Sequence, residues 1–440
     1  MRTMDELGDL QRTHMAADVT ADSAGVKVVL MGFVENVRDL GGIKFFILRD
    51  FSGSVQITMP KQKVSESLLS KASALTPESC VAVVGTVVRA RQAPRGVEVI
   101  PSEIRILNLA ETPLPLDVTG KVKANLDTRL DARAMDLRRQ EVLAIFKIRH
   151  HALQAIRERL LSLGFIEVHT PKIVATATES GAALFPVTYF DQEAFLSQSP
   201  QLYKEVLTGA FEKVFEVGPI FRAEEHDTPR HLNEATSVDI EMAYARAEDV
   251  MKVLEDVLVA AFSRVSERCR EELRILDRDL EVPKTPFPRL TYSEVLQKLD
   301  EAGLHIAWGE DIPTQAEKKL AEMLPGPYFI TDWPLKIKPF YTMPKPGMPE
   351  LAEAFDLMYG SLELASGGTR IHQHELLVER LKANRLNPES FKYHLLPFRY
   401  GLPPHAGWGL GLDRLTMVLT GADNIRECVL FPRDKRRLVP

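Results

Sequence analysis

Cysteine is scarce in this chain of 440 residues, and none of its three cysteines stands in a metal-binding spacing. Cys80, Cys269 and Cys428 lie far apart in the sequence, so any single disulfide would leave the third cysteine unpaired. The sequence therefore argues against a disulfide scaffold and predicts a protein of the reducing cytoplasm.

Long apolar segments are also missing. No run of about 18 apolar residues occurs, so no membrane-spanning helix is predicted. Residues Met1 to Glu6 include acidic groups and no apolar stretch, so no signal peptide is predicted either. The content of 45% hydrophobic and 26% charged residues is ordinary for a globular protein. A net charge of −6 disfavours nucleic-acid binding over the whole surface, but not on one basic face.

Short strands separated by turns dominate residues 21–110, after a polar lead-in over residues 1–20 that we expect to be loosely held. The pattern predicts five strands with one short helix between the third and the fourth. The strands are expected at 26–37, 43–49, 55–59, 81–90 and 97–106, and the helix at 64–74. This count and order predict an OB-fold barrel, and a different small β-sandwich is the alternative.

Two prolines in the segment Thr112 to Leu116 mark a domain boundary, because proline neither continues a helix nor pairs inside a sheet. Residues 111–139 mix acidic and basic side chains, which predicts a hinge. A second domain is expected over 140–440, beginning with an amphipathic helix at 141–163 that Gly164 ends.

The second domain is predicted to be α+β. After a strand ending at Pro171, strands alternate irregularly with helices such as 247–273 and 315–324. The neighbouring strands 213–220 and 235–243 have the pattern of a hairpin, which favours an antiparallel or mixed sheet flanked by helices.

The segment Gly407-Trp408-Gly409-Leu410-Gly411-Leu412-Asp413-Arg414 has glycines at alternate positions. Alternation on a strand would remove every side chain from one face, so that a flat ring such as a nucleotide base can lie against the backbone. A helical apolar pattern begins straight afterwards, which places Arg414 where the strand becomes a helix. The spacing is neither that of a dinucleotide fingerprint nor that of a P-loop, and tight strand packing is the structural alternative.

A second arginine motif, Phe221-Arg222-Ala223-Glu224, follows the strand at 214–220. We expect Arg222 and Glu224 to share one strand face, and Asp239 and Glu241 to share a face of the returning strand. Four charged side chains on facing strands are costly inside a protein unless they meet a ligand, a metal or each other. An exposed ion-pair ladder is the other interpretation.

Taken in order, Pro171, the Phe221–Glu224 motif and the Gly407–Arg414 stretch resemble the three motifs of class II aminoacyl-tRNA synthetases. The predicted barrel points to the aspartate, asparagine and lysine subgroup. Ser199-Pro200-Gln201-Leu202-Tyr203-Lys204 and Gly367-Gly368-Thr369-Arg370 are similar to those of archaeal-type aspartyl-tRNA synthetases. The resemblance implies a ligase that activates L-aspartate with ATP and transfers it to the 3′ end of tRNA(Asp).

The resemblance also implies roles for single residues. Arg222 and Arg414 are the catalytic arginines, which clamp the α-phosphate and cover adenine respectively. The residues expected to bind ATP are Arg222, Glu224, His231, Glu363, Gly409, Gly411 and Arg414. The residues expected to bind aspartate are Glu179, Gln201, Lys204, Asp239 and Arg370. Asp356 and Glu363 are expected to bind Mg²⁺, since hard carboxylates suit a cation that bridges phosphates.

One position departs from the family. Many relatives have an aromatic residue four positions after His231, where it stacks on adenine, and this chain has Ala235. A different side chain then covers that face of adenine, or Arg414 and the glycine strand provide most of the contact.

In the barrel, Phe45 and Gln56 match positions that stack on and read the anticodon bases, while a buried core position is the alternative for Phe45. Glu35 and Pro94 stand where strictly tRNA(Asp)-specific relatives resemble each other in having Trp and Lys. Their absence favours a non-discriminating enzyme that also charges tRNA(Asn). Glu35 could instead accept from cytosine and favour tRNA(Asp) alone.

The family resemblance further implies a homodimer formed through helix 141–163, although the apolar face of that helix also suits core packing. If tRNA(Asn) is charged, a tRNA-dependent amidotransferase is the expected partner. An asparaginyl-tRNA synthetase is a remote alternative because it would not be expected to carry Lys204. A catalytically silent RNA-binding paralogue is also remote, because every charged motif residue is present.

Overall fold

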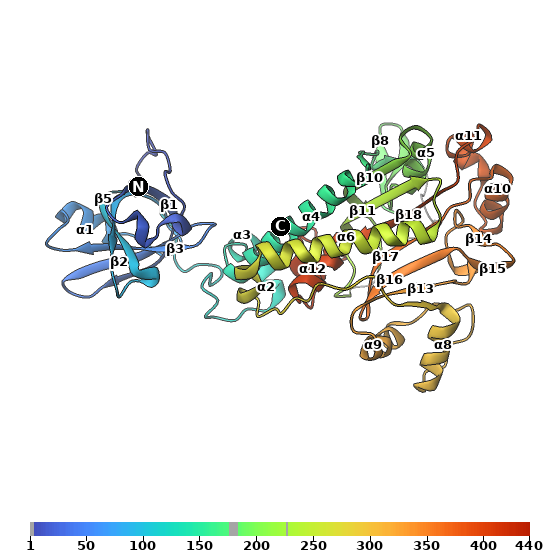
Figure 1. The fold of residues 1–440 in the computed structure, drawn as a ribbon. Helices are drawn as coiled ribbons and strands as arrows, with labels where there is room; N and C mark the ends of the chain where they lie inside the picture. The colour runs from blue at the N-terminus through green and yellow to red at the C-terminus, as the bar shows by residue number, and fades with distance from the viewer. Residues whose placement is uncertain (1–3, 176–183, 226–227) are drawn as a thin grey trace. The chain divides into compact units, whose positions relative to one another are not determined.

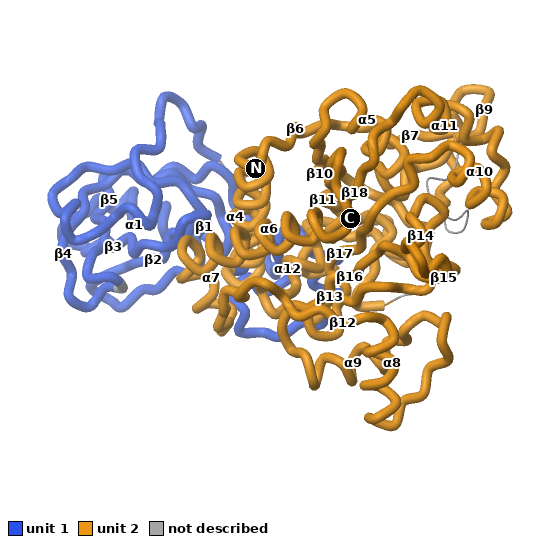
Figure 2. Tube along the Cα trace, turned by 45° about the vertical axis from the view of Figure 1, so that its right-hand side comes forward, with its two compact units in different colours: residues 1–139 blue, residues 140–440 orange. Residues whose placement is uncertain are grey.

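The computed structural model describes residues 4–175, 184–225 and 228–440. The chain divides into two compact units, Met1–Arg139 and Gln140–Pro440, which Figure 2 draws in different colours. Among the helices of the described residues, none has both the length and the apolar character that a membrane crossing needs.

The first unit contains a closed five-stranded barrel with the strand order β1-β2-β3-β5-β4. Its strands are β1 (Lys27–Asp39), β2 (Ile43–Arg49), β3 (Ser54–Pro60), β4 (Cys80–Arg89) and β5 (Val97–Asn108), and α1 (Glu66–Ser73) lies between β3 and β4 in the chain. Alternate residues of each strand point into one apolar core that includes Leu30, Phe46, Ile57 and Val83. The prediction of an OB-type barrel is therefore confirmed, and the β-sandwich alternative is excluded.

The lead-in is not loosely held, so that prediction was wrong. Ala16 and Val19 are fully buried in the barrel core. The Asp5 amide donates to the Ile106 carbonyl at 2.8 Å, and Lys71 Nζ approaches the Asp5 carboxylate at 2.8 Å. The apolar positions in this segment are too few to show a period, although they are enough to anchor it on the barrel.

The segment expected as a hinge contains two short helices, α2 (Leu126–Asp131) and α3 (Arg133–Asp136). The fully buried Asp136 carboxylate accepts from Arg129 at 2.9 Å and from Arg133 at 2.6 Å. Further along, the Arg138 guanidinium lies 4.1 Å above the centre of the Phe33 ring of the barrel. The mixed charges of this segment thus form ordered ion pairs.

The second unit is built on an eight-stranded mixed sheet with the order β12-β13-β16-β17-β18-β11-β10-β6. The central strands are antiparallel, and the outermost pairs β12–β13 and β10–β6 are parallel. The strands are β6 (Ile166–Glu167), β10 (Lys213–Phe221), β11 (Glu234–Ala243), β12 (Arg289–Thr291), β13 (Pro327–Thr331), β16 (Ala354–Tyr359), β17 (Leu362–Thr369) and β18 (His405–Gly411). This arrangement confirms the α+β prediction.

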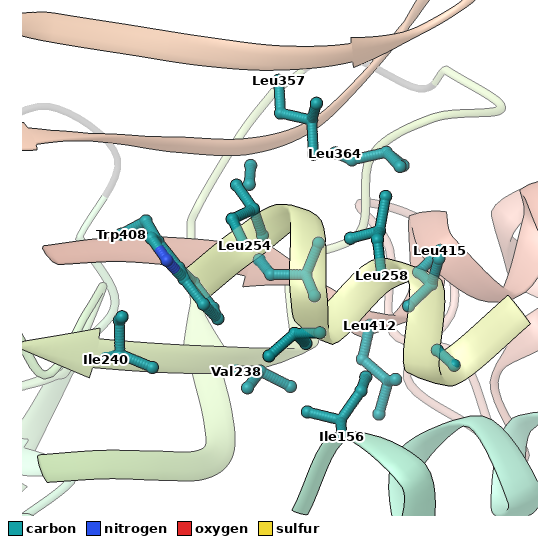
Figure 3. Close-up of a cluster of buried hydrophobic side chains, with 14 of the residues drawn as sticks. Ile156, Val238, Ile240, Leu254, Leu258, Leu357, Leu364, Trp408, Leu412 and Leu415 are labelled. Carbon is teal, nitrogen blue, oxygen red and sulfur yellow. The ribbon is translucent and has the colours of Figure 1, made fainter. Parts of the chain in front are cut away.

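One face of this sheet packs against helices α4 (Gln140–Ser162), α6 (Ala247–Arg268) and α12 (Leu412–Thr420) (Figure 1). Val238, Ile240 and Trp408 point from the strands toward Leu254 and Leu258 of α6, as Figure 3 shows. Since side chains alternate along a strand, the residues between them face the opposite side. That opposite side carries the polar groups of the candidate site.

Smaller elements complete the second unit. They are β7 (Ile173–Val174), β8 (Pro186–Tyr189), β9 (Gln192–Leu196), α5 (Gln201–Phe211), α7 (Arg270–Ile275), α8 (Tyr292–Glu301), α9 (Thr314–Met323), β14 (Pro344–Lys345), β15 (Met348–Ala352), α10 (His374–Ala383) and α11 (Lys392–Arg399).

Two predicted element boundaries were wrong, and so was the strand face expected for Arg222 and Glu224. The strand expected to reach Pro171 ends at Glu167, and the helix expected over 247–273 is interrupted at Cys269. Strand β10 ends at Phe221, so Arg222 and Glu224 do not share a strand face. The Arg222 amide nevertheless donates to the Asn233 carbonyl at 2.9 Å, which continues the pairing with the returning chain for one residue.

Candidate active site

A cavity of about 430 Å³ opens on the face of the sheet opposite α6. Strands β10, β11, β17 and β18 contribute to it, together with the start of α5 and the segment after β10. Its charged lining residues are six cations, Lys204, Arg222, Arg230, Lys338, Arg370 and Arg414, and four carboxylates, Glu224, Asp239, Glu363 and Asp413. Cations outnumber carboxylates here in a chain of net charge −6, so the cavity suits an anionic ligand.

The three glycines of β18 have different neighbours. Ala406, Trp408 and Leu410 enter the apolar core, so Gly407, Gly409 and Gly411 face the cavity side, as the alternation predicts. A Cβ atom on Gly407 would lie 2.1 Å from Oε2 of Glu241, whereas the three atoms nearest to one on Gly411 all belong to the Arg414 side chain, at 3.8 Å. Gly407 therefore makes room for a protein carboxylate, and only Gly409 and Gly411 line the cavity.

Arg414 lies over the end of this strand. Its Nη1 donates to the Glu363 carbonyl at 2.9 Å and its Nε to the Arg230 carbonyl at 3.3 Å. Neighbouring Asp413 is buried, pairs with Arg149 of α4 and accepts from the Thr236 amide at 2.8 Å. The helix start is thereby fixed to α4 and β11, which holds the Arg414 guanidinium at the cavity.

The segment between β10 and β11 contributes Arg222, Glu224, Arg230 and His231 to the lining. Burial and the nearby Arg414 guanidinium lower the pKa of His231, whose Nδ1 lies 2.7 Å from the Thr228 hydroxyl. His231 is thus neutral at pH 7. Ala235 also lines the cavity, and the adjacent wall carries Ile425 and Leu232 rather than an aromatic ring.

A buried charge cluster forms one end of the cavity. Lys204 Nζ donates to the Asp239 carboxylate at 2.9 Å and to the Trp408 carbonyl at 3.1 Å. Glu241, which is fully buried, lies 3.5 Å from Lys204 Nζ and accepts from Arg370 Nε at 3.1 Å. Glu241 therefore holds the Lys204 and Arg370 side chains beside each other, both aimed into the cavity.

Helix α5 presents a polar stripe inward. Gln201, Lys204, Glu205 and Thr208 are its buried residues, at the spacing of one helix face. Gln201 and Lys204 line the cavity, while Glu205 lies behind them. Helix α5 has no charged residue on its exposed face, and its buried polar stripe places Gln201 and Lys204 at the cavity.

The predicted metal residues Asp356 and Glu363 lie on the antiparallel strands β16 and β17. Asp356 is buried and accepts from Lys338 Nζ at 2.6 Å, and its pKa is raised because burial outweighs that cation. Glu363 is 44% exposed and lines the cavity, as does Ser366, which is opposite Asp356 in the strand register. No cluster of three His, Cys, Asp or Glu side chains suited to a metal occurs among residues 4–175, 184–225 and 228–440.

The predicted anticodon residues lie on the barrel. Phe45 and Gln56 point away from its core on neighbouring strands, so Phe45 is not a core residue. Gln56 Nε2 donates to the Glu98 carboxylate at 3.1 Å. Glu35 is the extra residue of a bulge in β1, and Pro94 begins a short 3₁₀ turn before β5. A bulge redirects its side chain, which suits a contact residue.

Several cavity residues were not predicted from the sequence. They are Arg230, Lys338 and Ser366, together with Glu241, whose role beneath the cavity was not assigned. The sequence placed Glu241 on the same strand face as Asp239, but it did not show that Glu241 would pair with Arg370. The predicted residue Glu179 lies outside the described residues.

Two family models match the chain. One, described as tRNA synthetases class II (D, K and N), matches residues 125–435, and the other, an OB-fold nucleic acid binding domain, matches residues 28–107. The chain belongs to the class II tRNA synthetases. The resemblance found in the motifs is thereby confirmed.

Relatives of this class II synthetase are similar over nearly the whole chain. A protein of Methanopyrus kandleri named Aspartate--tRNA(Asp/Asn) ligase is 57% identical, covering 96% of this chain and 98% of its own length. One of the same name from Archaeoglobus fulgidus is 56% identical, covering 96% and 99%.

Solved synthetase structures have the same fold. Asparaginyl-tRNA synthetase from Pyrococcus horikoshii, complexed with asparaginyl-adenylate, superposes with a TM-score of 0.94 at 33% identity, covering 98% of this chain and 100% of that one. Aspartyl tRNA synthetase from Entamoeba histolytica superposes with a TM-score of 0.87 at 32% identity, covering 99% and 94%.

Proposed function

We propose that this synthetase is an aspartate–tRNA ligase that activates L-aspartate with ATP and charges both tRNA(Asp) and tRNA(Asn). The observation that carries the proposal is the pair of buried cations, Lys204 and Arg370, at one end of a cavity whose other parts suit a nucleotide. The relatives named for both tRNAs, at 50–57% identity, support the dual tRNA specificity.

The proposed first step needs no nucleophile from the protein. An oxygen of the aspartate α-carboxylate bonds to the α-phosphorus of ATP, the bond to the bridging oxygen breaks, and pyrophosphate leaves with that electron pair. The protein aligns two anions and compensates the charge that builds on phosphorus. Arg222 holds the α-phosphate, and Arg414 lies against adenine on the floor formed by Gly409 and Gly411. Glu224 and His231 complete the ATP site.

The proposed basis of amino-acid choice is charge. Asparagine has nearly the shape of aspartate, but its neutral amide would leave Lys204 and Arg370 facing only Asp239 and Glu241. Truncating one partner of a buried charge pair costs about 2–5 kcal/mol, or on the order of 30-fold to several thousandfold in affinity. Gln201 and Asp239, with Glu179, are proposed to receive the α-ammonium group.

We propose that residues of β16 and β17 at the edge of the cavity would hold Mg²⁺ beside the ATP phosphates. Glu363 and Ser366 offer hard oxygen atoms there, and Oδ1 of the buried Asp356 has no hydrogen-bond partner among the described residues. This donor set fits Mg²⁺, which uses one or two carboxylates and substrate phosphates in place of a full protein cage. When bound, the ion would offset phosphate charge.

For tRNA, we propose that Phe45 stacks on an anticodon base and that Gln56 reads its neighbour. Glu35 and Pro94 are proposed to border the third anticodon base without the Trp and Lys of stricter enzymes. Further parts of the proposal rest on the family alone: a homodimer through α4, an amidotransferase that converts the product on tRNA(Asn), and a place in the cytoplasm.

The decisive experiment is ATP–pyrophosphate exchange with purified protein and Mg²⁺. We expect exchange with aspartate and none above background with asparagine, and Lys204→Met should abolish the aspartate signal. Exchange with asparagine alone would favour an asparaginyl enzyme, and no exchange with either would indicate a silent paralogue.

Charging of tRNA(Asn) transcripts tests the dual specificity. We expect transcripts with U or with C at the third anticodon position both to accept aspartate. If the transcript with U is not charged, the enzyme is strictly specific for tRNA(Asp).

A further inference from the structure

A carboxylate and two imidazoles meet behind the aspartate end of the cavity. Glu205 comes from α5, His394 from α11 and His405 from the start of β18, and their residues are 0%, 8% and 0% exposed. They do not line the cavity, so they are not ligand contacts. Burying three titratable groups together is costly unless they compensate one another.

The hydrogen bonds of the two rings determine where their protons are. Nδ1 of His394 lies 3.2 Å from the Leu202 carbonyl, and Nδ1 of His405 lies 2.8 Å from the Pro403 carbonyl. A carbonyl oxygen only accepts, so each Nδ1 carries a hydrogen. In a neutral imidazole Nε2 is then a bare acceptor.

Both Nε2 atoms face the same carboxylate oxygen. Glu205 Oε2 lies 3.3 Å from His394 Nε2 and 3.9 Å from His405 Nε2. None of the three atoms has another hydrogen-bond partner of regular geometry in the part of the chain that the structure describes. Three acceptors with no hydrogen between them would repel at low dielectric, so one additional proton belongs in this cluster.

The surrounding charges favour an imidazolium at His405. Burial by itself lowers the pKa of His405, but the Glu205 carboxylate outweighs it and Glu241 of β11 adds to the effect, so the pKa is raised. Arg370 opposes a positive charge on His405, and so do His394 and His372 when they are protonated. Burial and the charge of His405 lower the pKa of His372. The cluster is therefore a carboxylate compensated by one shared proton.

The other oxygen of Glu205 is linked by a hydrogen bond to Gln201, which lines the cavity. Gln201 Nε2 donates to Glu205 Oε1 at 2.5 Å, one helical turn apart on α5. Because a carboxylate cannot donate, the NH₂ side of the Gln201 amide must face Glu205. Its carbonyl oxygen then faces away from Glu205, and Gln201 lines the cavity beside Lys204.

We propose that Glu205 is a positioning residue for amino-acid binding, which holds the Gln201 amide with its oxygen toward the substrate ammonium while a proton shared with His394 and His405 compensates its own buried charge. The inference rests on the proposed function, because that function supplies the ammonium. It adds a residue that never touches the substrate.

Two substitutions separate the two parts of this role. Glu205→Met keeps the length but offers Gln201 no acceptor, so we expect the KM for aspartate in pyrophosphate exchange to rise about tenfold while kcat and the KM for ATP change less than about threefold. Glu205→Gln retains an acceptor for Gln201, and its NH₂ can donate to one bare imidazole nitrogen. We expect its KM for aspartate to stay within about threefold of wild type. The exposed Glu379→Gln on α10 is the matched control.

NMR of ¹⁵N-histidine-labelled full-length protein reads the shared proton directly. We expect one imidazolium, assigned to His405 by its loss in His405→Gln, that titrates above the ordinary value of about 6.5 in wild type. In Glu205→Gln that ring should be neutral at pH 7, with hydrogen on Nδ1. A wild-type protein whose buried rings are all neutral at pH 6.5, or an imidazolium unchanged in Glu205→Gln, would overturn the shared proton.

An unchanged KM for aspartate in a folded Glu205→Met would overturn the positioning role. If that variant does not fold, the NMR comparison of wild type and Glu205→Gln still decides whether the cluster holds a proton. A wild-type protein without aspartate-dependent exchange would refute the proposed function instead, whereas activity with no response to Glu205→Met would refute only this inference.

Discussion

At the scale of single residues, the second unit places its charged groups by close contact between backbone and side chain. The space above Gly407 is filled by the Glu241 carboxylate, which in turn orders Arg370 and lies near Lys204. A glycine next to the proposed nucleotide site is therefore needed here for the end of the cavity where aspartate is proposed to bind. Gly407, which was not among the residues expected to bind ATP, does not line the cavity.

Gly407→Ala should damage aspartate binding more than ATP binding. The added Cβ would lie 2.1 Å from the Glu241 carboxylate and 2.2 Å from the Ile240 carbonyl, so the backbone or Glu241 must move. We expect a loss of about 1–3 kcal/mol in stability and a rise of at least about tenfold in the KM for aspartate. Steady-state pyrophosphate exchange measures both KM values.

Gly411→Ala is the matched variant, because the atoms nearest to its Cβ belong to the Arg414 side chain at 3.8 Å, an ordinary contact distance. Here we expect the KM for ATP to rise and the KM for aspartate to change little. If both variants raise the same KM value, the separate roles proposed for Gly407 and Gly411 are contradicted.

At the scale of elements, the turns that follow β18 and β10 position the cavity residues Arg414 and Arg222. The turn from β18 into α12 is fixed by Asp413, which links the helix start to Arg149 of α4 and to the Thr236 amide of β11. The sequence predicted that Arg414 lies at this turn, but not the contacts that fix the turn. The pairing of the Arg222 amide with Asn233 could not be predicted from the β10 pattern, because it depends on the returning strand.

Asp413→Asn should loosen this joint. The amide keeps one acceptor but removes the charge opposite Arg149, so we expect the second unit to lose about 2 kcal/mol of stability and exchange activity to fall. Differential scanning calorimetry should show a lower Tm, with the exposed Asp423→Asn as control. An unchanged Tm would mean that the other contacts of α12 suffice to fix it.

At the scale of the whole molecule, the sites proposed for amino-acid activation and for anticodon binding belong to different compact units. The cavity lies entirely within Gln140–Pro440, and the proposed anticodon residues lie in the barrel of Met1–Arg139. Substitutions in the barrel should therefore change the KM for tRNA and leave amino-acid activation unchanged.

Phe45→Ala tests this separation. Its ring points away from the barrel core, so the fold should tolerate the change. Losing one base-stacking contact costs about 1–3 kcal/mol, so we expect the KM for tRNA to rise about fivefold to 150-fold. Aspartate-dependent pyrophosphate exchange without tRNA should be unchanged. Leu40→Ala, at a side chain 71% exposed, is the control for surface effects, and a parallel loss of exchange would contradict independence of the units.

The sequence by itself determined the periodic and local features. Strand alternation and turn residues predicted the five strands and the position of α1 along the chain, because burial on one face repeats every second residue. The glycine alternation of β18 and the ordered motifs identified the family. Helix 141–163 was predicted to within one residue at each end, because helical apolar spacing is strong over 23 residues.

Only the tertiary structure decided which distant groups meet. Glu241 beneath Gly407, Lys338 on Asp356 and Glu205 between two histidines are contacts across elements, and no period in the sequence encodes them. The burial of the lead-in was equally hidden, because two apolar side chains establish no pattern. Residue type and spacing select the elements, whereas the packing of the sheet decides which charges compensate one another.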